Sequence, residues 1–470
     1  MSGPSAPTPQ RIAIVVPSTA EYDSRTYRIA SALAARGHAV TVLARWAPGL
    51  PRDEVHTAGY RILRVPVSAV DGLPLPRWAR ETIAGVRSRR TGVRSRGIDG
   101  TPAGATAAGA GRPTVASGDE TAARIEPGRG PGARAKRLAA GARRLAAIGL
   151  TVRSQGRATR AVAPDVDLVH GMAYMGIPVA LGVARRHGAR IVYDARDIYI
   201  DAANLARLPR PLRAVLARAE RGWARAADRV VTVNRPYAEV MAERWSLPLP
   251  LVVMNCAYRF DPPEPPERRF HARLGLAADA SVVLYHGGFS RDRGIEQLVE
   301  AIPDVPGAVL VLLGYGSLQA ELERAAADPA LADPHLGARV RILPAVPPTE
   351  LLWWVASADV VAMPIQPTTL NHRLTTPNKL FEAMAVGVPV VASDLPGMAP
   401  IVADTGCGLV VDPTVLAAIA AALRSILGAT VEERDAYRMR ALAAARGTYG
   451  WEHQVELLLA EYGLLTGRPW

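Results

Sequence analysis

A lysine and a glutamate three residues apart are well suited to bind a charged, hydroxyl-rich ligand. Lys379 and Glu382 lie in a segment reading TTPNKLFEAMAVGVPVVAS over 375–393, and Lys379 is one of two lysines among 56 basic residues. The apolar spacing predicts a helix that begins near Asn378, ends before Gly387 and leads into a buried strand over 388–392. Amide groups at a helix N-terminus and an ammonium favour an anion, and a carboxylate one turn later accepts bonds from hydroxyls. A sugar nucleotide offers both kinds of group, although Asn378 and Glu382 can also simply start and solubilise a helix.

Two glycine turns after neighbouring predicted strands extend this pattern. Gly287 and Gly288 follow a strand over 282–286 and precede Arg291 and Arg293, and Gly314 follows a strand over 309–313. Glycines let the backbone approach a ligand closely, and an arginine at a helix start can pair with a phosphate. Neither turn completes a dinucleotide fingerprint and no Gly-Lys-Ser/Thr loop occurs, which argues against a nicotinamide enzyme and an NTPase.

The sequence shows no typical metal site. The pair Asp165 and Asp167 is explained by a boundary between a loop and a strand, and the nine histidines have no zinc-type spacing. Cys256 and Cys407 are far apart, which fits a reduced interior. We therefore expect no metal and no cofactor, with basic side chains neutralising a bound diphosphate.

The positive charge is concentrated in one segment. The formal net charge is +13, and residues 77–160 alone hold 18 basic and five acidic residues. Within it, 85–132 is rich in small residues and is predicted to be disordered. Residues 133–163 predict a basic helix that either lies on an anionic membrane surface or packs on the protein. Without interleaved aromatics, nucleic acid is not an expected partner.

The N-terminal residues and the hydropathy of the chain indicate where in the cell the protein is expected. Residues 1–10 lack the features of a secretory signal, and no apolar run reaches the about 18 residues needed to span a bilayer. We expect a cytoplasmic protein, either soluble or peripheral on the inner face of the plasma membrane.

Strands and helices alternate in two consecutive runs, separated by a proline-rich linker at 261–266. This rhythm predicts an α/β fold with two Rossmann-like parallel-sheet domains that face a cleft, where ligands bind at the carboxyl ends of the strands. The expected domains are 1–258, 259–445 and a C-terminal helix over 446–470 that packs back towards the first domain.

With these residues the chain resembles the retaining GT-B glycosyltransferases of group 1, or family 4, which use nucleotide sugars. The resemblance spans nearly the whole chain outside the basic insert. It is carried by Asp23-Ser24-Arg25 before a helix, Asp167-Leu168-Val169-His170, the turn 287–294, the run 377–394, and Trp451 in a terminal helix ending near Tyr462.

The resemblance implies roles for individual residues. Arg293 and Lys379 would bind the diphosphate, and Glu382 would accept hydrogen bonds from the ribose; these three form the expected catalytic set. The remaining donor-binding positions would be Gly287, Gly288, Arg291, Gly314, Asn378 and Leu380. The acceptor would be bordered by Asp23, Arg25, His170 and Arg196. The sugar would move to a hydroxyl with retention, and catalysis would rest on stabilising the leaving diphosphate and orienting the acceptor.

Three positions depart from the family pattern. An arginine that is often found near the position of Gly288 is replaced, which leaves Arg291 or Arg293 to carry the phosphate charge. Many members have an acidic residue at the position of Leu374, and many have histidine at that of Arg196. Arg196 stays protonated and cannot act as a base, but it can bind a phosphate on the acceptor. We expect transfer of a hexose or N-acetylhexosamine, most plausibly from UDP, to a glycan or lipid-linked acceptor of glycolipid or polysaccharide type. The alternatives are a sugar-nucleotide epimerase, whose paired acids are not found, and a non-catalytic nucleotide-sugar-binding or membrane-associated scaffold.

Overall fold

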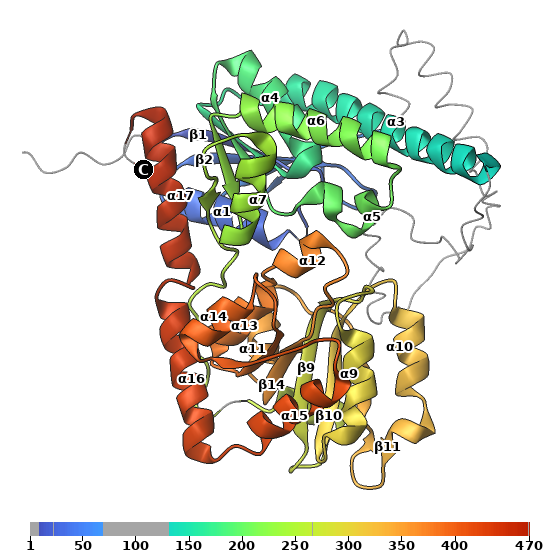
Figure 1. Ribbon diagram of the computed structural model, residues 1–470. Helices are drawn as coiled ribbons and strands as arrows, with labels where there is room; N and C mark the ends of the chain where they lie inside the picture. Colours follow the sequence, from blue (N-terminus) through green and yellow to red (C-terminus); the bar gives the residue numbers. More distant parts are fainter. Residues whose placement is uncertain (1–8, 22, 69–130, 266, 469) are drawn as a thin grey trace, which may run out of the picture.

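The computed structural model describes residues 9–21, 23–68, 131–265, 267–468 and 470. The segment predicted to be disordered, 85–132, lies outside the described residues except for its last two positions. The described chain forms two α/β domains, each built on a mainly parallel sheet (Figure 1).

The N-terminal domain contains a sheet of eight strands in the order β3-β4-β2-β1-β5-β6-β7-β8, parallel except for β3. The strands are β1 Arg11–Val15, β2 Ala39–Arg45, β3 Asp53–Val55, β4 Arg61–Val65, β5 Leu168–Met172, β6 Arg190–Ala195, β7 Arg229–Thr232 and β8 Leu251–Val252. Its helices are α1 Ser24–Ala35, α3 Pro131–Val162, α4 Ala173–His187, α5 Ala203–Ala206, α6 Arg210–Ala226 and α7 Arg235–Trp245, with a 3-10 turn, η1, over Tyr199–Asp201. The central strands are buried on both faces, as expected for a parallel sheet covered by helices.

The C-terminal domain contains six parallel strands in the order β13-β10-β9-β14-β15-β16. They are β9 Ser281–Gly288, β10 Ala308–Tyr315, β13 Val340–Leu343, β14 Val360–Met363, β15 Val390–Ser393 and β16 Gly408–Val411, and a small hairpin pairs β11 Ala332–Asp333 with β12 Gly337–Ala338. The helices are α8 Arg269–Leu274, α9 Ile295–Ala301, α10 Gln319–Ala326, α11 Leu351–Val355, α12 Leu370–Leu374, α13 Asn378–Val386, α14 Ala399–Thr405 and α15 Leu416–Leu427, with 3-10 turns η2 Ile302–Asp304 and η3 Pro329–Leu331. The predicted α/β fold with two parallel sheets is therefore confirmed.

Two C-terminal helices run along one side of both domains (Figure 1). Helix α16, Val431–Arg446, packs against α13, and α17, Trp451–Thr466, packs against α1. Trp451, Leu458 and Tyr462 of α17 are buried in the same hydrophobic cluster as Ile12 and Ile14 of β1. The end of the chain thus completes the core of the N-terminal domain.

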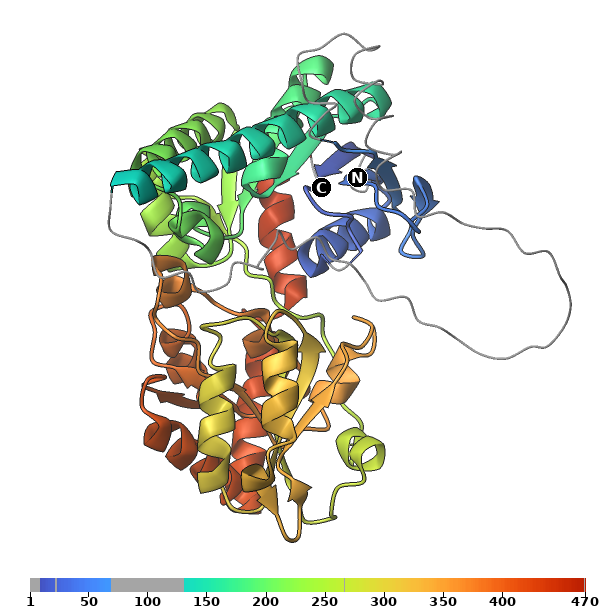
Figure 2. The same ribbon diagram turned by 90° about the vertical axis from the view of Figure 1, so that its right-hand side faces the viewer.

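The predicted basic helix forms α3, which packs against α4 and α6 (Figure 2). Its closest approach to α6 is at Gly141, where an added Cβ would lie 2.7 Å from a methyl carbon of Leu212. Residues 134–140 are exposed, whereas Ser154 and Gln155 are buried. The carboxyl-terminal half of α3 is therefore packed against the N-terminal domain.

Candidate active site between the two domains

The N-terminus of α13 presents Lys379 beside an aromatic ring. The helix follows Pro377, whose side chain provides no capping hydrogen bond, so the first turn keeps backbone N–H groups available. Lys379 is partly exposed, and its Nζ lies 3.4 Å from the centre of the Tyr285 ring. Such a cation–π contact holds the ammonium group in place but leaves its charge uncompensated.

Arg293 supplies a second positive charge at the same place. It is partly exposed at the turn before α9. Burial, and then the nearby Arg293 guanidinium, lower the pKa of Lys379 well below its usual range, while Glu382 opposes the shift. No hydrogen bond or ion pair joins Lys379 or Arg293 to another residue in the part of the chain that the structure describes. Two adjacent cations without a counterion form a site for an anion.

The carboxylate of Glu382 is turned towards the N-terminal domain. Its Oε1 lies 3.6 Å from Nη2 of Arg28 on α1, and its Oε2 lies 3.7 Å from Nδ1 of His286 at the end of β9. Burial and the Lys379 charge lower the pKa of His286 to about 3, so this ring is neutral at physiological pH. Burial raises the pKa of Glu382 against the opposing charges of Arg28 and Lys379. Glu382 therefore contacts both domains.

The predicted glycines lie next to each other, within the last residues of β9 and β10 rather than in turns after these strands. Gly314 pairs with Gly287 and has a φ of 158°, and a Cβ added to it would lie 2.0 Å from the Gly287 carbonyl oxygen. Gly287 and Gly288 are exposed, and a Cβ added to either would have no neighbour within 4 Å. Gly314 is thus required by the close packing of the strands, whereas the space beside Gly287 and Gly288 is open to a ligand.

The other residues predicted on the donor side differ from Lys379 and Arg293, because their side chains are engaged in contacts within the protein. Arg291 is exposed and donates to Glu321 of α10 at 2.6 Å, so its charge is compensated. Asn378 Oδ1 accepts a hydrogen bond of 2.9 Å from Asn255 of the N-terminal domain. Leu380 is 0% exposed within the hydrophobic core, because it belongs to the apolar stripe of α13. The Leu380 side chain is therefore part of the core, and the assignment of this position to the donor site stays a prediction.

On the acceptor side, Asp23 and Arg196 form an ion pair at 2.7 Å. Asp23 also caps α1 by accepting from the Thr26 N–H. Burial raises the pKa of Asp23, but the Arg196 charge and this cap outweigh it and hold the pKa below its ordinary value. An acceptor phosphate at Arg196 would have to compete with this carboxylate.

Arg25 and His170 are not surface residues. Arg25 donates to Asp194 at 2.7 Å, and the ionised Asp194 also accepts from His170 Nε2 at 3.0 Å. His170 Nδ1 is left to accept from the Tyr462 hydroxyl of α17 at 2.5 Å. Although burial opposes it, Arg25 and His170 hold the pKa of Asp194 below its usual range. All four side chains are buried and join α17 to the first sheet, so any acceptor contact at Arg25, or in the loop after His170, stays a prediction.

A hydrogen-bonded contact between the domains, which the sequence did not suggest, lies at α12 (Figure 1). Asn371 Oδ1 accepts from the Ile198 N–H at 2.9 Å and from the Tyr237 hydroxyl at 2.8 Å, and Asn371 Nδ2 donates to Asp197 at 3.2 Å. Leu374, the position that departs from the family pattern, packs against the core of the N-terminal domain. The segment that leads into α13 is thereby fixed to that domain.

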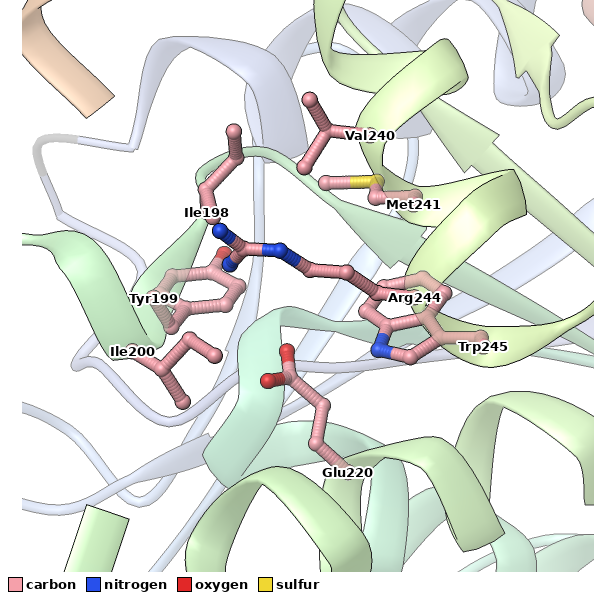
Figure 3. Close-up of a pocket in the computed structure, with 8 residues that line it drawn as sticks. All are labelled: Ile198, Tyr199, Ile200, Glu220, Val240, Met241, Arg244 and Trp245. Atoms are coloured by element: carbon pink, nitrogen blue, oxygen red, sulfur yellow. The ribbon is translucent and has the colours of Figure 1, made fainter. Parts of the chain in front are cut away.

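A small cavity in the N-terminal domain lies behind the loop that follows β6. Figure 3 shows Glu220 of α6 and Arg244 of α7 among the side chains that line it, together with Tyr199. Tyr193 donates to the Glu220 carboxylate at 2.9 Å, and burial raises the pKa of Glu220 to about 7. The cavity is too small for a sugar nucleotide, and we assign it no ligand.

Two kinds of feature are absent from the described residues. No group of three or more His, Cys, Asp or Glu side chains there is arranged to hold a metal ion. None of the helices described is both long and apolar enough to cross a membrane.

Part of the chain is similar in sequence to known glycosyltransferases. Residues 280–429 match the family model described as Glycosyl transferases group 1. The D-inositol 3-phosphate glycosyltransferase of Xylanimonas cellulosilytica is 32% identical over 221 residues, which are 44% of this chain and 49% of the relative. That of Nocardia farcinica is 34% identical over 200 residues, covering 41% of this chain and 42% of the relative. The matched regions thus span less than half the length of either relative.

Solved structures share the fold of the whole chain. Sucrose-phosphate synthase from Thermosynechococcus elongatus has a TM-score of 0.66 at 20% identity, with 97% of this chain and 99% of that chain covered. Anabaena HepE in complex with UDP has a TM-score of 0.60 at 15% identity, with 97% and 100% covered. At this level of identity the similarity concerns the arrangement of elements.

Proposed function

We propose that this chain, which carries a group 1 glycosyltransferase domain within a GT-B fold, transfers a hexose or N-acetylhexosamine from a nucleoside diphosphate, most plausibly UDP, to a hydroxyl acceptor of glycolipid or polysaccharide type. The single observation that carries the proposal is the uncompensated pair Lys379 and Arg293 beside the open turn at Gly287 and Gly288. A diphosphate matches this site in charge, and the exposed backbone of the turn lets it approach closely.

In this mechanism the protein stabilises the leaving group. Lys379 and Arg293 neutralise the charge that develops on the diphosphate as the bond to the sugar breaks, and the amide groups at the start of α13 add to this field. The two cations and the helix end suffice without a metal ion. Glu382 is held by Arg28 and His286, and each carboxylate oxygen retains a lone pair for a ribose hydroxyl. The proton of the acceptor passes to the departing phosphate, and the sugar is transferred with retention.

The test is a panel of UDP-, GDP- and ADP-sugars, each assayed for binding and for hydrolysis or transfer. We expect one nucleotide series to bind and to turn over, with the product anomer reporting retention. Absence of binding by every member of the panel would reject the proposal.

A non-catalytic relative of the same fold is the second candidate. Leu374 stands where many members of the family carry an acid and packs against the core of the N-terminal domain, and the Arg196 charge is already paired with Asp23. Tight binding without turnover of any sugar nucleotide would favour this alternative.

We also propose that α3 and α6 bind an anionic membrane surface. Helix α3 contains no acidic residue, and the one acidic residue of α6, Glu220, is buried. The exposed basic residues are Arg134, Lys136, Arg137, Arg143, Arg144, Arg153, Arg157 and Arg160 on α3, and Arg210, Arg218, Arg221 and Arg225 on α6. The two helices pack together, and this concentration of exposed positive charge without an exposed acid would attract anionic lipid headgroups.

Sedimentation with phosphatidylglycerol vesicles tests this second proposal. Binding should weaken as salt rises, and a variant with Arg134, Lys136 and Arg137 all changed to Gln should bind at least tenfold more weakly, since each charge contributes about 1 kcal/mol near such a surface. The matched control changes three exposed arginines of the C-terminal domain to Gln: Arg273, Arg434 and Arg440. Equal binding to neutral phosphatidylcholine vesicles, or an equal loss in the control, would contradict the proposal.

A further inference from the structure

Within the part of the chain that the structure describes, the Asp197 carboxylate lies between the domains without an ion-pair partner. Asp197 follows β6 and is partly exposed. The neighbouring carboxylates are engaged: Asp23 pairs with Arg196, Asp194 pairs with Arg25, and Glu382 faces Arg28. Among the described residues, the hydrogen-bond partner of the Asp197 carboxylate is the side-chain amide of Asn371, which reaches Oδ1. Its second oxygen, Oδ2, is free to accept a further bond.

Asn371 has its orientation fixed by the N-terminal domain. The two donors that reach its Oδ1, the Ile198 N–H and the Tyr237 hydroxyl, identify that atom as the acceptor. The NH₂ group must then point the other way, towards Asp197. Asn371 is 5% exposed, so it exchanges few of these bonds for water. Its hydrogen bond to Oδ1 therefore restrains the orientation of the Asp197 carboxylate.

Asp197 lies within the electrostatic reach of the proposed diphosphate site. Burial raises its pKa, whereas the hydrogen bond from Asn371 and the positive charges of Arg196 and Arg293 lower it. Arg293 belongs to the C-terminal domain and Asp197 to the N-terminal domain. The charge of Arg293 thus acts on Asp197 across the domain interface, which places this carboxylate near the proposed diphosphate site and within reach of a group attached to the diphosphate.

We propose that Asp197 accepts a hydrogen bond from a hydroxyl of the sugar being transferred, and that Asn371 positions it for this role. A carboxylate is an acceptor with no donor of its own, and sugar hydroxyls are donors that a nucleoside diphosphate alone lacks at this place. A bond of this kind distinguishes the sugar nucleotide from its parent diphosphate. The inference rests on the proposed function and specifies which residue recognises the sugar.

Calorimetric titration separates the two affinities. The probes are the pairs UDP-glucose and UDP, GDP-mannose and GDP, and ADP-glucose and ADP, and the pair that binds most tightly is carried forward. Asp197→Asn should weaken binding of the sugar nucleotide about tenfold or more, the effect of a lost charged hydrogen bond, and leave binding of the diphosphate unchanged. Asp165→Asn, at an exposed position, is the matched control and should change neither.

Asn371→Asp tests the positioning residue. The new carboxylate can still accept from Ile198 and Tyr237, but it repels Asp197 instead of donating to it. The same selective loss of sugar-nucleotide affinity is expected, with the melting temperature checked in parallel, and Asn371→Ala should lose that selectivity as well.

The outcomes separate this inference from the proposed function. Equal weakening of the sugar nucleotide and the diphosphate by Asp197→Asn, or no weakening of either, would overturn the role of Asp197 while leaving the diphosphate site intact. A change confined to the KM of an acceptor would also overturn it, because Asp197 would then bind the other substrate. Absence of binding by all three pairs to the wild-type protein would reject the proposed function and this inference together.

Discussion

Replacing Lys379 by methionine should make the free protein more stable and the enzyme less active. Methionine keeps much of the length of the side chain and its contact with Tyr285 but removes the charge. In the free protein that charge lies beside Arg293, with burial and repulsion together lowering the pKa of Lys379 well below its usual range. Removing it eliminates this unfavourable interaction.

The sign of the pH dependence follows from the same shift. The unfolded chain keeps the Lys379 proton up to its ordinary pKa of 10.5, whereas the folded protein releases it at lower pH. Over that interval the free energy of unfolding contributed by this group rises with pH. Lys379→Met removes this pH dependence. The gain in its free energy of unfolding over the wild type should be largest below the pKa of Lys379 in the folded protein and should shrink as pH approaches 10.5.

The effect on activity has the opposite direction. A charged hydrogen bond to the diphosphate contributes about 1.5–3 kcal/mol, which corresponds to roughly a 10- to 150-fold fall in kcat/KM. Donor hydrolysis or transfer measures this fall, and urea denaturation with and without the nucleoside diphosphate measures stability. Lys379→Arg keeps the charge and should retain more activity than the methionine variant.

The second lysine of the chain provides the matched control. Lys136 is exposed on α3, and Lys136→Met should leave soluble donor use and stability nearly unchanged. Unchanged kcat/KM in Lys379→Met would refute the assignment of the diphosphate site, and a loss of stability in the free protein would refute the electrostatic reasoning.

Two further predictions concern buried groups. Because burial raises the pKa of Glu220 from 4.5 to about 7, the unfolded chain loses this proton first and stability should fall by about 3 kcal/mol as pH rises through that interval. Glu220→Gln should flatten this slope in urea denaturation; an unaltered slope would show that another group is responsible. Tyr462→Phe removes the bond to His170 and should cost about 1–2 kcal/mol in the same measurement, and an unchanged midpoint would contradict the role of this contact.

The sequence predicts elements whose cause is local. The helix at α13 and the turns after β9 and β10 follow from apolar spacing and from glycines at strand ends, and the structure contains them. The same spacing already marked Leu380 as part of an apolar stripe, so its assignment to the donor site conflicted with the pattern that defined the helix. Periodicity was the better guide to this side chain.

The partners of the charged residues depend on contacts between distant parts of the chain. Asp23 and Arg196 are 173 positions apart, and Asn371 is 174 positions from Asp197. No local spacing indicates such pairs. Arg28 carries no sequence signal either, since it is one arginine within an otherwise ordinary helix, and its proximity to Glu382 results from the placement of the two domains.

The contacts that join the domains also determine the charge of the site. Glu382 lies only one helical turn from Lys379 and stabilises its charge at a distance, but its carboxylate lies closer to Arg28 and His286 and forms no ion pair with Lys379. Among the described residues, Lys379 and Arg293 of the C-terminal domain therefore have no ion-pair partner, and neither has the carboxylate of Asp197 on the N-terminal domain. A ligand that is anionic at one end and rich in neutral hydroxyl donors at the other matches this polarity, and an inorganic phosphate or a bare nucleotide matches only half of it.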